Sequence, residues 1–299
     1  MSKKFSKELL INQIESLGVS KGDVVFLTAD LLRVGYFRGN AEETLKDWVE
    51  ILMDVIGDEG TLVIPAYTET FFRFSSKKKA MFSSSAETTS GSLSKGIFKY
   101  AKPLRSTHPT NSCFAVGSQA QYILQGHDES ASSYLPYARV MALGGKNLLL
   151  GAIDEINGPM AFHCVQENLG HTRKHPSSGF YQSYYKDAEG DIKLFTRQDV
   201  GGCTRGVYKT YGPHMVANAI CVGVVGRSLS ACIDVKKSYD VLRHILQNSP
   251  SMIQCSDPLC TSCRGRFLYN RWGVLHFWPK KFFYFFFRIV SRSMGVKAE

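Results

Sequence analysis

The sequence predicts an α/β fold, with one large domain whose mixed, mainly parallel β-sheet is covered by helices, followed by a C-terminal appendage. Continuous apolar runs at 24–28 (VVFLT) and 60–68 (GTLVIPAYT) flank residues 41–55, where apolar side chains recur at helical spacing. Strand, helix and strand in this order form a βαβ unit, and continuous apolar strands indicate a parallel sheet that is buried on both faces. The 299 residues suffice for such a core without covalent staples.

The remaining patterns complete the predicted domain. Residues 180–200 alternate around the turn candidate Glu189-Gly190-Asp191, which indicates an antiparallel hairpin. Residues 70–90 lack periodicity and are rich in Ser and Lys, which predicts a long surface loop. Apolar runs and helical spacing predict three more strands and three more helices, at 112–117, 147–153 and 217–226, and at 118–124, 160–169 and 238–246.

The N-terminal segment predicts a cytoplasmic protein. Leu10, Ile14 and Leu17 recur at helical spacing among charges, and no apolar stretch precedes a small-residue cleavage site. Cytoplasmic thiols stay mostly reduced. The eight cysteines are therefore interpreted as buried small side chains, metal ligands or reactive thiols rather than as a disulfide framework.

The net charge of +10 is concentrated at the C-terminus. Residues 264–299 carry eight Lys or Arg and one acidic residue, which leaves only +3 for residues 1–263. The same 36 residues hold 11 of the 36 aromatic side chains. We therefore divide the chain into a nearly neutral domain at 1–250 and a segment at 251–299 that combines a cysteine-containing loop with a basic aromatic tail.

The tail suits a surface rather than a bilayer interior. Its apolar runs within 271–294 are short and are interrupted by Pro279, Lys280 and Lys281, so they do not span a membrane. Aromatic residues mixed with cations are typical of an in-plane membrane contact, here the cytoplasmic face of the inner membrane. A hydrophobic contact between copies in a homo-oligomer is the alternative. Nucleic acid is not expected as a partner, because the FFYFFF run favours leaving water over stacking on bases.

Three cysteines precede the tail in the pattern Cys255-x4-Cys260-x2-Cys263. They can occupy three corners of a tetrahedral zinc site or part of an iron–sulfur site, and partly buried thiols in a tight loop are the plainer alternative. No cysteine follows them. A fourth ligand would have to be His244, His276, an earlier cysteine or an exogenous group.

Two histidines stand in segments that suit chemistry. Pro109 biases His108 away from helical geometry and places it in a loop before the strand at 112–117. His163 lies early in the helix at 160–169, where Glu167, four residues on, shares its face and can orient the ring. Cys164 is next to His163, but consecutive helical residues do not share a face, so it is not expected to be a nucleophile. A structural role for either histidine is the alternative.

Three collinear segments carry a resemblance to a known family. In order and spacing they resemble the strand–loop–helix opening, the GTLVxP strand, the RSxHP loop and the GxxLLLG…HxxE segment of the aminoglycoside 3-N-acetyltransferases, over about residues 10–170 and more weakly to about 250. The resemblance implies an acetyl-CoA-dependent N-acyltransferase. Its α/β fold is unlike the common acetyltransferase fold, whose Q/R-x-x-G-x-G/A signature is absent from this sequence.

The resemblance also implies roles for individual residues. His163 corresponds to the general base, which would remove a proton from the acceptor amine during direct transfer. One set of residues corresponds to the loop that lines the acyl-CoA site: Arg105, Ser106, Thr107 and His108. A second set corresponds to the turn whose N–H groups meet the CoA pyrophosphate at a helix start: Ala29, Asp30 and Leu31.

Two positions depart from the family pattern. Asp30 replaces a serine, and its carboxylate would repel a pyrophosphate unless it caps the helix and turns away. The family acid lies three residues after the histidine, where this chain has Gln166. Either Glu167 orients the ring, or Gln166 positions it.

Charge location guides the expected acceptor. Drug-modifying members of the family attract polycationic aminoglycosides and should have acidic pockets, whereas this domain is slightly basic. We therefore expect N-acetylation of an amino sugar carried on a nucleotide or lipid diphosphate in bacterial surface-polysaccharide biosynthesis. The alternatives are an aminoglycoside 3-N-acetyltransferase that confers antibiotic resistance, and a catalytically inactive, metal-stabilised membrane scaffold.

Overall fold

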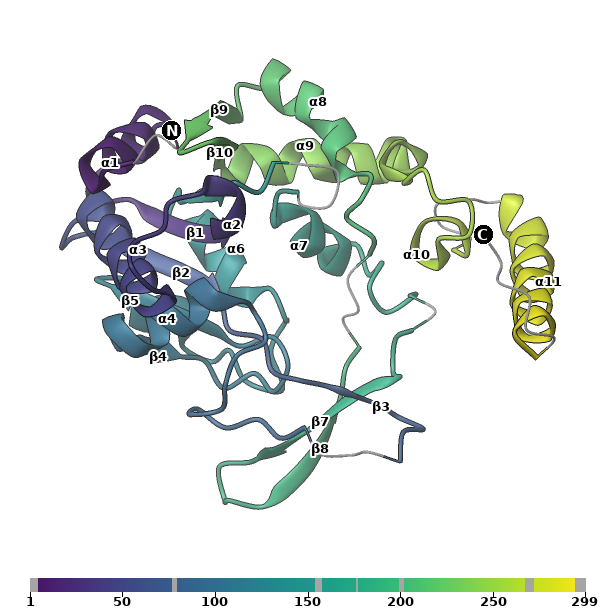
Figure 1. The fold of residues 1–299 in the computed structure, drawn as a ribbon. Helices are drawn as coiled ribbons and strands as arrows, with labels where there is room; N and C mark the ends of the chain where they lie inside the picture. The colour runs from purple at the N-terminus through teal and green to yellow at the C-terminus, as the bar shows by residue number, and fades with distance from the viewer. Residues whose placement is uncertain are drawn as a thin grey trace.

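The computed structural model describes residues 5–76, 80–153, 158–175, 177–198, 202–266 and 272–293. A seven-stranded sheet in the order β4-β5-β2-β1-β6-β10-β9 forms its centre, and a three-stranded sheet, β3-β7-β8, projects from one end (Figure 1). The large sheet comprises β1 (Val24–Ala29), β2 (Thr61–Pro65), β4 (Leu104–Arg105), β5 (Cys113–Gly117), β6 (Lys146–Leu150), β9 (Ile220–Val225) and β10 (Ser228–Asp234). The small sheet comprises β3 (Phe71–Phe72), β7 (Tyr181–Lys186) and β8 (Ile192–Thr196).

The large sheet is mixed, with a parallel centre. Strand β1 pairs in parallel with both β2 and β6. Next to these strands, β5 and β10 run antiparallel, and the outer strands β4 and β9 reverse direction once more. Five of the seven strands therefore point the same way. This arrangement confirms the predicted α/β fold with a mixed, mainly parallel sheet.

Helices cover the sheet on both faces, and two further helices lie in the C-terminal segment, away from the sheet. In chain order these are α1 (Lys7–Ser16), α2 (Leu31–Val34), α3 (Ala41–Ile56), α4 (Ser92–Ala101), α5 (Ala120–Leu124), α6 (Leu135–Ala142), α7 (Ala161–Asn168), α8 (Tyr211–Val216), α9 (Val235–Asn248), α10 (Thr261–Arg264) and α11 (Gly273–Ser293). Short 3-10 turns lie at η1 (Val207–Thr210) and η2 (Pro250–Ile253).

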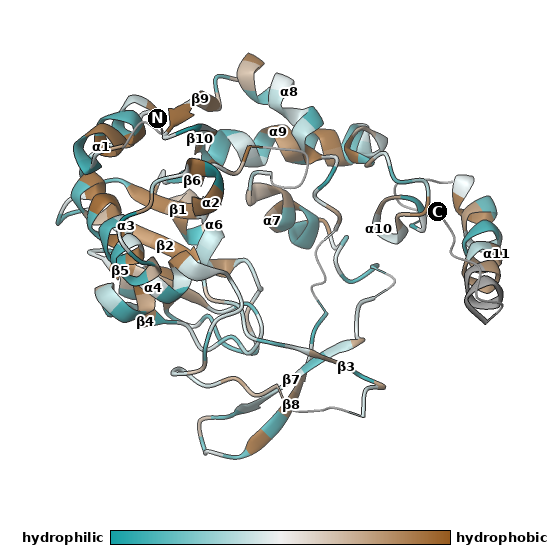
Figure 2. Ribbon diagram, viewed as in Figure 1, coloured by the Kyte–Doolittle hydropathy of each residue, from teal (hydrophilic) through white to brown (hydrophobic). Residues whose placement is uncertain are grey.

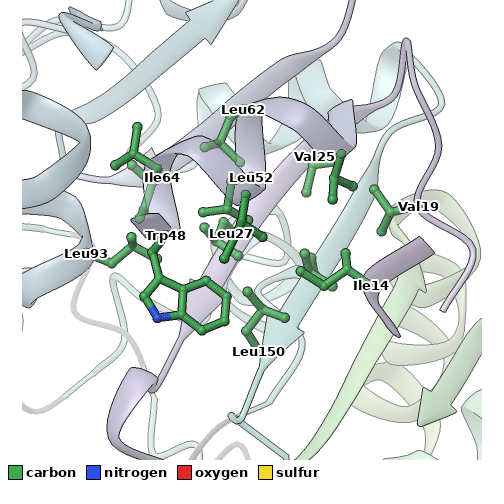
Figure 3. Packing of buried hydrophobic residues seen from close by; sticks show 14 of the residues in the cluster. Ile14, Val19, Val25, Leu27, Trp48, Leu52, Leu62, Ile64, Leu93 and Leu150 are labelled. Carbon is green, nitrogen blue, oxygen red and sulfur yellow. The ribbon is translucent and has the colours of Figure 1, made fainter. Parts of the chain in front are cut away.

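Alternate residues of β1 supply two separate cores. Val25 and Leu27 pack with α1, α3 and α4 on one face, around the fully buried Trp48 (Figure 3). Val24 and Phe26 pack with α5, α6, α7 and α9 on the other. Each fully buried side chain of this size contributes about 1.5–3 kcal/mol to folding. Burial on both faces explains why the strand has a continuous apolar run, which appears brown in Figure 2.

Most predicted elements are confirmed with shifted ends. The βαβ unit is β1, α3 and β2, and the hairpin is β7 and β8, which pair antiparallel. The strands at 112–117 and 147–153 and the helices at 118–124, 160–169 and 238–246 correspond to β5, β6, α5, α7 and α9. The strand expected at 217–226 begins only at Ile220. Its partner β10 went unpredicted because buried Ser230, which accepts the N–H of Gly151, interrupts the apolar pattern.

The interpretation of residues 70–90 as a surface loop is wrong in part. Phe71 and Phe72 form β3 and pair antiparallel with β7, and Met81 bridges to Tyr184. A two-residue strand is too short to show a period in the sequence. Residues 77–79 of this segment lie outside the described part.

The C-terminal segment ends in a helix at the edge of the molecule (Figure 1). Helix α11 runs through Pro279 without a break and packs on α10, with Phe277 buried at the contact. Among the described residues, no helix combines the length and the apolarity needed to cross a membrane. Residues 271 and 294, which bound the predicted surface segment, lie outside the described part.

Candidate active site

The catalytic histidine predicted from the sequence lies on the first turn of α7. The ring of His163 is half-buried and stacks on Tyr134, with ring centroids 5.7 Å apart and an interplanar angle of 19°. Its Nδ1 lies 3.2 Å from Oε1 of Gln166, one helical turn further on. The ring is therefore held both by its face and by one edge.

The backbone fixes which end of the Gln166 amide faces the histidine. The N–H of Gly202 donates to Oε1 of Gln166 at 3.1 Å, so this atom must be the acceptor oxygen. Because an amide oxygen accepts hydrogen bonds, Nδ1 of His163 is the protonated nitrogen of the neutral ring, and Nε2 carries the lone pair. The arrangement prepares Nε2 to act as a general base.

The carboxylate of Glu167, the other candidate for orienting the ring, binds a neighbouring loop. Its carboxylate accepts the backbone N–H of Ser133 at 2.9 Å and of Tyr134 at 3.3 Å, and also the hydroxyl of Ser132. Glu167 therefore anchors the loop that leads into α6. Of the two alternatives, the structure supports Gln166, which keeps the three-residue spacing of the family with a neutral amide in place of an acid.

His108 lies in the predicted loop between β4 and β5 and is fully buried. Its Nδ1 accepts the backbone N–H groups of Thr110 and Asn111, at 3.3 and 3.0 Å. The hydrogen of the neutral ring is therefore on Nε2, which lies 3.3 Å from Oγ of Ser133. With this tautomer His108 acts as a hydrogen-bond donor and not as a base.

A second histidine, which the sequence analysis missed, supports His108. His127 stacks on it with ring centroids 4.9 Å apart, and its Nδ1 lies 2.9 Å from Oγ of Ser106. Burial, together with the neighbouring His108, lowers the pKa of His127 to about 3. His127 is thus uncharged at neutral pH, and the hydroxyl of the buried Ser106 holds its ring.

Arg105 and Thr107 lie away from the stacked rings of His108 and His127. The guanidinium of Arg105 donates to the carbonyls of Ala66, Ser83, Ser84 and Ala86, between the rings of Phe82 and Phe114. Arg105 therefore ties the chain around 82–86 to the sheet. Thr107 is exposed, and its N–H donates to the carbonyl of His127. A role for these two residues in acyl-CoA binding stays a prediction.

A cavity of about 470 Å³ opens beside His108 and Glu167, and we call it the His108 cavity. Its charged lining consists of Glu129, Glu167 and Arg173, and serine hydroxyls from 130–133 add hydrogen-bonding groups. The hairpin contributes Phe195, whose ring meets His108 edge to face at 5.2 Å. The cavity is therefore polar and bears more acidic than basic groups.

A second cavity, of about 610 Å³, lies at the carboxyl end of β1, and we call it the Asp30 cavity. Its lining includes Ala29, Asp30 and Leu31, together with the start of α3 and Gly91 and Ser92 at the start of α4. Helix α4 has no side-chain cap at its N-terminus. The start of α3 is capped by Asn40 and carries Glu42 and Glu43 in its first turn. The N-terminal N–H groups and the positive dipole end of α4 are therefore the part of this cavity that suits an anion.

The carboxylate of Asp30 meets one part of the condition set by the sequence. It caps α2 by accepting the N–H of Arg33 at 3.2 Å and forms an ion pair with the guanidinium of the same residue. The negative charge is thereby partly offset by Arg33, although Asp30 still lines the cavity. Ala29, Asp30 and Leu31 thus line one cavity, and their role in binding CoA stays a prediction.

Two cysteine predictions have different outcomes. Cys164 is buried, and burial raises the pKa of its thiol to about 12, which suits a packed side chain and not a nucleophile.

Cys255, Cys260 and Cys263 do converge, and the fourth member of the group is Cys203, with all four Sγ atoms within 4.8 Å of one another. The fourth group is thus an earlier cysteine and not His244 or His276.

The chain is an α/β domain that carries a histidine–amide pair on α7 and, apart from it, a cavity at the start of α4. A sequence model of the aminoglycoside 3-N-acetyltransferase family matches residues 26–247. The chain belongs to this family.

Curated relatives belong to the same family, and their alignments cover about half of this chain. The chain is 29% identical over 160 residues to aminoglycoside N(3)-acetyltransferase VII of Streptomyces paromomycinus, which is 48% of this chain and 54% of that protein. It is 29% identical over 177 residues to aminoglycoside N(3)-acetyltransferase III of Salmonella sp., which is 54% of this chain and 60% of that protein. The chain therefore aligns with little more than half the length of these relatives.

Solved structures share the fold more completely. The apoenzyme of aminoglycoside acetyltransferase AAC(3)-IVa superposes with a TM-score of 0.70 at 21% identity, over 88% of this chain and 96% of the other. A complex of AAC-IIIb with CoASH gives a TM-score of 0.65 at 18% identity, over 82% and 97%. At these identities the likeness concerns the fold.

Proposed function

We propose that this protein is an acetyl-CoA-dependent N-acetyltransferase whose acceptor is an amine of an aminoglycoside or a closely related amino sugar. The observation that carries the proposal is the His163–Gln166 pair in a member of this family. The pair presents a neutral imidazole with its lone pair on Nε2, which is the state that a base requires.

The proposed chemistry combines the two cavities with the base on α7, although His163 lines neither cavity. The Asp30 cavity would take the phosphates of acetyl-CoA at the N-terminus of α4. Nε2 of His163 accepts a proton from the acceptor nitrogen as that nitrogen bonds to the acetyl carbon, and the carbon–sulfur bond then breaks to release CoA as its thiolate. Acid–base catalysis of this kind contributes about 10²–10⁴-fold.

Local charge supports one of the acceptors. The whole domain is slightly basic, but among the described residues the His108 cavity is lined by two carboxylates, Glu129 and Glu167, and one cation, Arg173. This balance favours a cationic aminoglycoside over an anionic sugar diphosphate. Relatives support the same acceptor, since AAC(3)-IVa has been solved with a gentamicin and AAC-VIa with sisomicin. The alternative acceptor from the sequence is therefore the better supported one.

A nucleotide- or lipid-linked amino sugar is the second candidate, and α11 is the observation that favours it. Side chains on several sides of this helix are exposed, including Phe283 at 75% and Phe286 at 72%. Such a helix can lie on a membrane surface close to lipid-linked sugars. One of its cations is less available to a membrane, however, because the Lys281 ammonium donates to Leu259 and Thr261 within the protein.

Release of CoA with a panel of acceptors tests the proposal. We expect turnover with gentamicin-like aminoglycosides, weaker turnover with amino sugars on a nucleotide diphosphate, and none with His163→Ala. Preference for the sugar nucleotide would move the assignment to the second candidate. Absence of both acetyl-CoA binding and turnover would leave the inactive scaffold as the better description.

A further inference from the structure

The four cysteines form a cluster of their own, apart from the cores of the sheet. Cys255, Cys260 and Cys263 are buried, Cys203 is half-buried, and they pack on one another and not into the two cores beside the sheet. All four Sγ atoms lie within 4.8 Å of one another. Tetrahedral zinc with bonds of about 2.3 Å to sulfur holds its sulfurs about 3.8 Å apart, so small shifts complete the geometry.

The local backbone is arranged as at a thiolate–metal site. Cys260 precedes α10 and Cys263 lies within it, so one helical turn brings their sulfurs to the same side. The N–H of Cys255 points to Sγ of Cys263 at 3.5 Å, which would stabilise a thiolate. Arg264 donates to the carbonyl of Cys255 at 3.1 Å, and Arg205 forms an ion pair with Asp257 of the same loop. The guanidinium of Arg264 would offset part of the negative charge of a four-thiolate centre.

We propose that Cys203, Cys255, Cys260 and Cys263 bind one structural zinc ion. Four sulfur ligands in a closed tetrahedral set are typical of structural zinc. The ion would join the C-terminal loop at 255–263 to the domain through Cys203, and these four side chains form a cluster of their own. The site is distinct from the His108 and Asp30 cavities, because none of the four cysteines lines them.

The zinc site also connects to the proposed base. Gly202, the neighbour of Cys203, donates its N–H to the amide oxygen of Gln166 that faces His163. Ser262, between two of the cysteines, lies 2.8 Å from Nε2 of His175, and Arg266 donates to the carbonyl of His171, just after α7. Zinc binding would therefore fix the positions of Gly202 and of the residues that follow α7. This connection to activity rests on the proposed function, whereas the metal site itself does not.

Metal analysis of the full chain, purified in reductant without chelator, tests the site. We expect one zinc ion per chain, and Co²⁺ in its place should give the strong thiolate-to-metal absorption of a tetrahedral site. Cys260→Ser and Cys203→Ser should each retain less than about a tenth of the zinc. Cys221→Ser, which alters an exposed cysteine outside the cluster, is the matched control and should keep it all.

A second measurement serves where the serine variants fail to fold. A thiol-specific mercurial, titrated into the wild-type chain, should release the zinc as four thiols react. A chain without metal that takes up neither Zn²⁺ nor Co²⁺ overturns the proposal, as do two disulfides found by mass spectrometry or one iron bound in place of zinc. Full zinc in Cys203→Ser would remove Cys203 from the ligand set. Zinc binding without acetyltransfer would refute the proposed function and leave the metal site standing.

Discussion

Oε1 of Gln166 lies 3.2 Å from Nδ1 of His163, and the same oxygen accepts the N–H of Gly202 at 3.1 Å. A neutral amide therefore occupies the place of the acid in the family pattern. It sets the tautomer and the direction of the ring without adding a charge. The consequences of this difference can be measured.

Replacement of His163 tests the base itself. We expect His163→Ala to lower kcat at least a hundredfold while leaving the affinity for CoA within about threefold, because the base acts on the acceptor and does not hold CoA. Steady-state kinetics and calorimetry with CoA measure the two quantities. His244→Ala, at an exposed position on α9, is the control. Activity above about a tenth of wild type would remove His163 from the mechanism.

A carboxylate at position 166 should change the pH dependence. In Gln166→Glu the new charge stabilises the protonated ring, so the acidic limb of kcat/KM should move to higher pH by about one unit. The pH–rate profile measures this shift. Glu167→Gln is the matched control, and it should leave the limb in place while weakening the loop at 132–134. The opposite pattern would make Glu167 the orienting group.

The structure explains why the sequence could not decide between these two residues. Positions three and four residues after His163 both lie near its face of a helix. The choice depends on distant segments, because the loop at 132–134 binds Glu167 and Gly202 binds Gln166. Spacing along one helix therefore indicates candidates, and tertiary contacts assign their roles.

Cys203 could not be assigned from the sequence for the same reason, since its partners are distant in the chain. Cys203 lies 52 residues before Cys255, and a single cysteine in a Gly-Gly-Cys run gives no signal of a shared site. The strands and helices of the sheet were predictable because their burial on both faces leaves a local apolar pattern. Strand β3 and the His108–His127 stack leave no such pattern, since they depend on segments far apart in the chain.

A side chain at position 202 should disturb the base indirectly. A Cβ on Gly202 would clash with Nε2 of Gln166 and push the amide away from His163. We expect Gly202→Ala to lower kcat about tenfold with the KM for acetyl-CoA unchanged. Gly212→Ala, where a Cβ meets nothing within 4 Å, is the matched control and should be close to wild type. Equal effects of the two changes would contradict the positioning role of Gly202.

The buried His127 should make stability depend on pH. Its folded pKa of about 3 lies below the ordinary value of 6.5, so below pH 6.5 the unfolded chain binds a proton that the folded chain excludes. The free energy of unfolding should therefore fall as pH decreases from 6.5 towards 3, by up to about 1.4 kcal/mol per pH unit from this residue. Urea unfolding at several pH values measures it.

His127→Phe provides the comparison for this effect. Phenylalanine keeps a ring against His108 but has no site for a proton. The variant should be less stable at pH 7, because the Ser106 hydroxyl loses one of its hydrogen-bond partners, and the difference from wild type should shrink as pH falls. A difference that stays constant between pH 7 and 4.5 would show that His127 is protonated equally in both states.

Removal of α11 tests what the exposed aromatic helix does. The chain truncated after residue 270 should retain acetyltransfer, since both cavities lie within residues 29–198, and should lose binding to anionic vesicles. Each Lys or Arg near such a surface contributes about 1 kcal/mol, and apolar insertion adds to it. Sedimentation with phosphatidylserine-containing vesicles at low and high salt measures the binding.

A point variant separates membrane contact from packing within the protein. Phe283→Ser with Phe286→Ser keeps Phe277 and Lys281 in place on α10 and removes only exposed apolar surface. If α11 binds membranes, this variant should stay soluble and leave the vesicle pellet, as the truncated chain does. If the full chain never sediments with vesicles, and the double variant instead converts a dimer to a monomer in light scattering, α11 is a contact between copies. The second candidate for the acceptor would then lose its structural support.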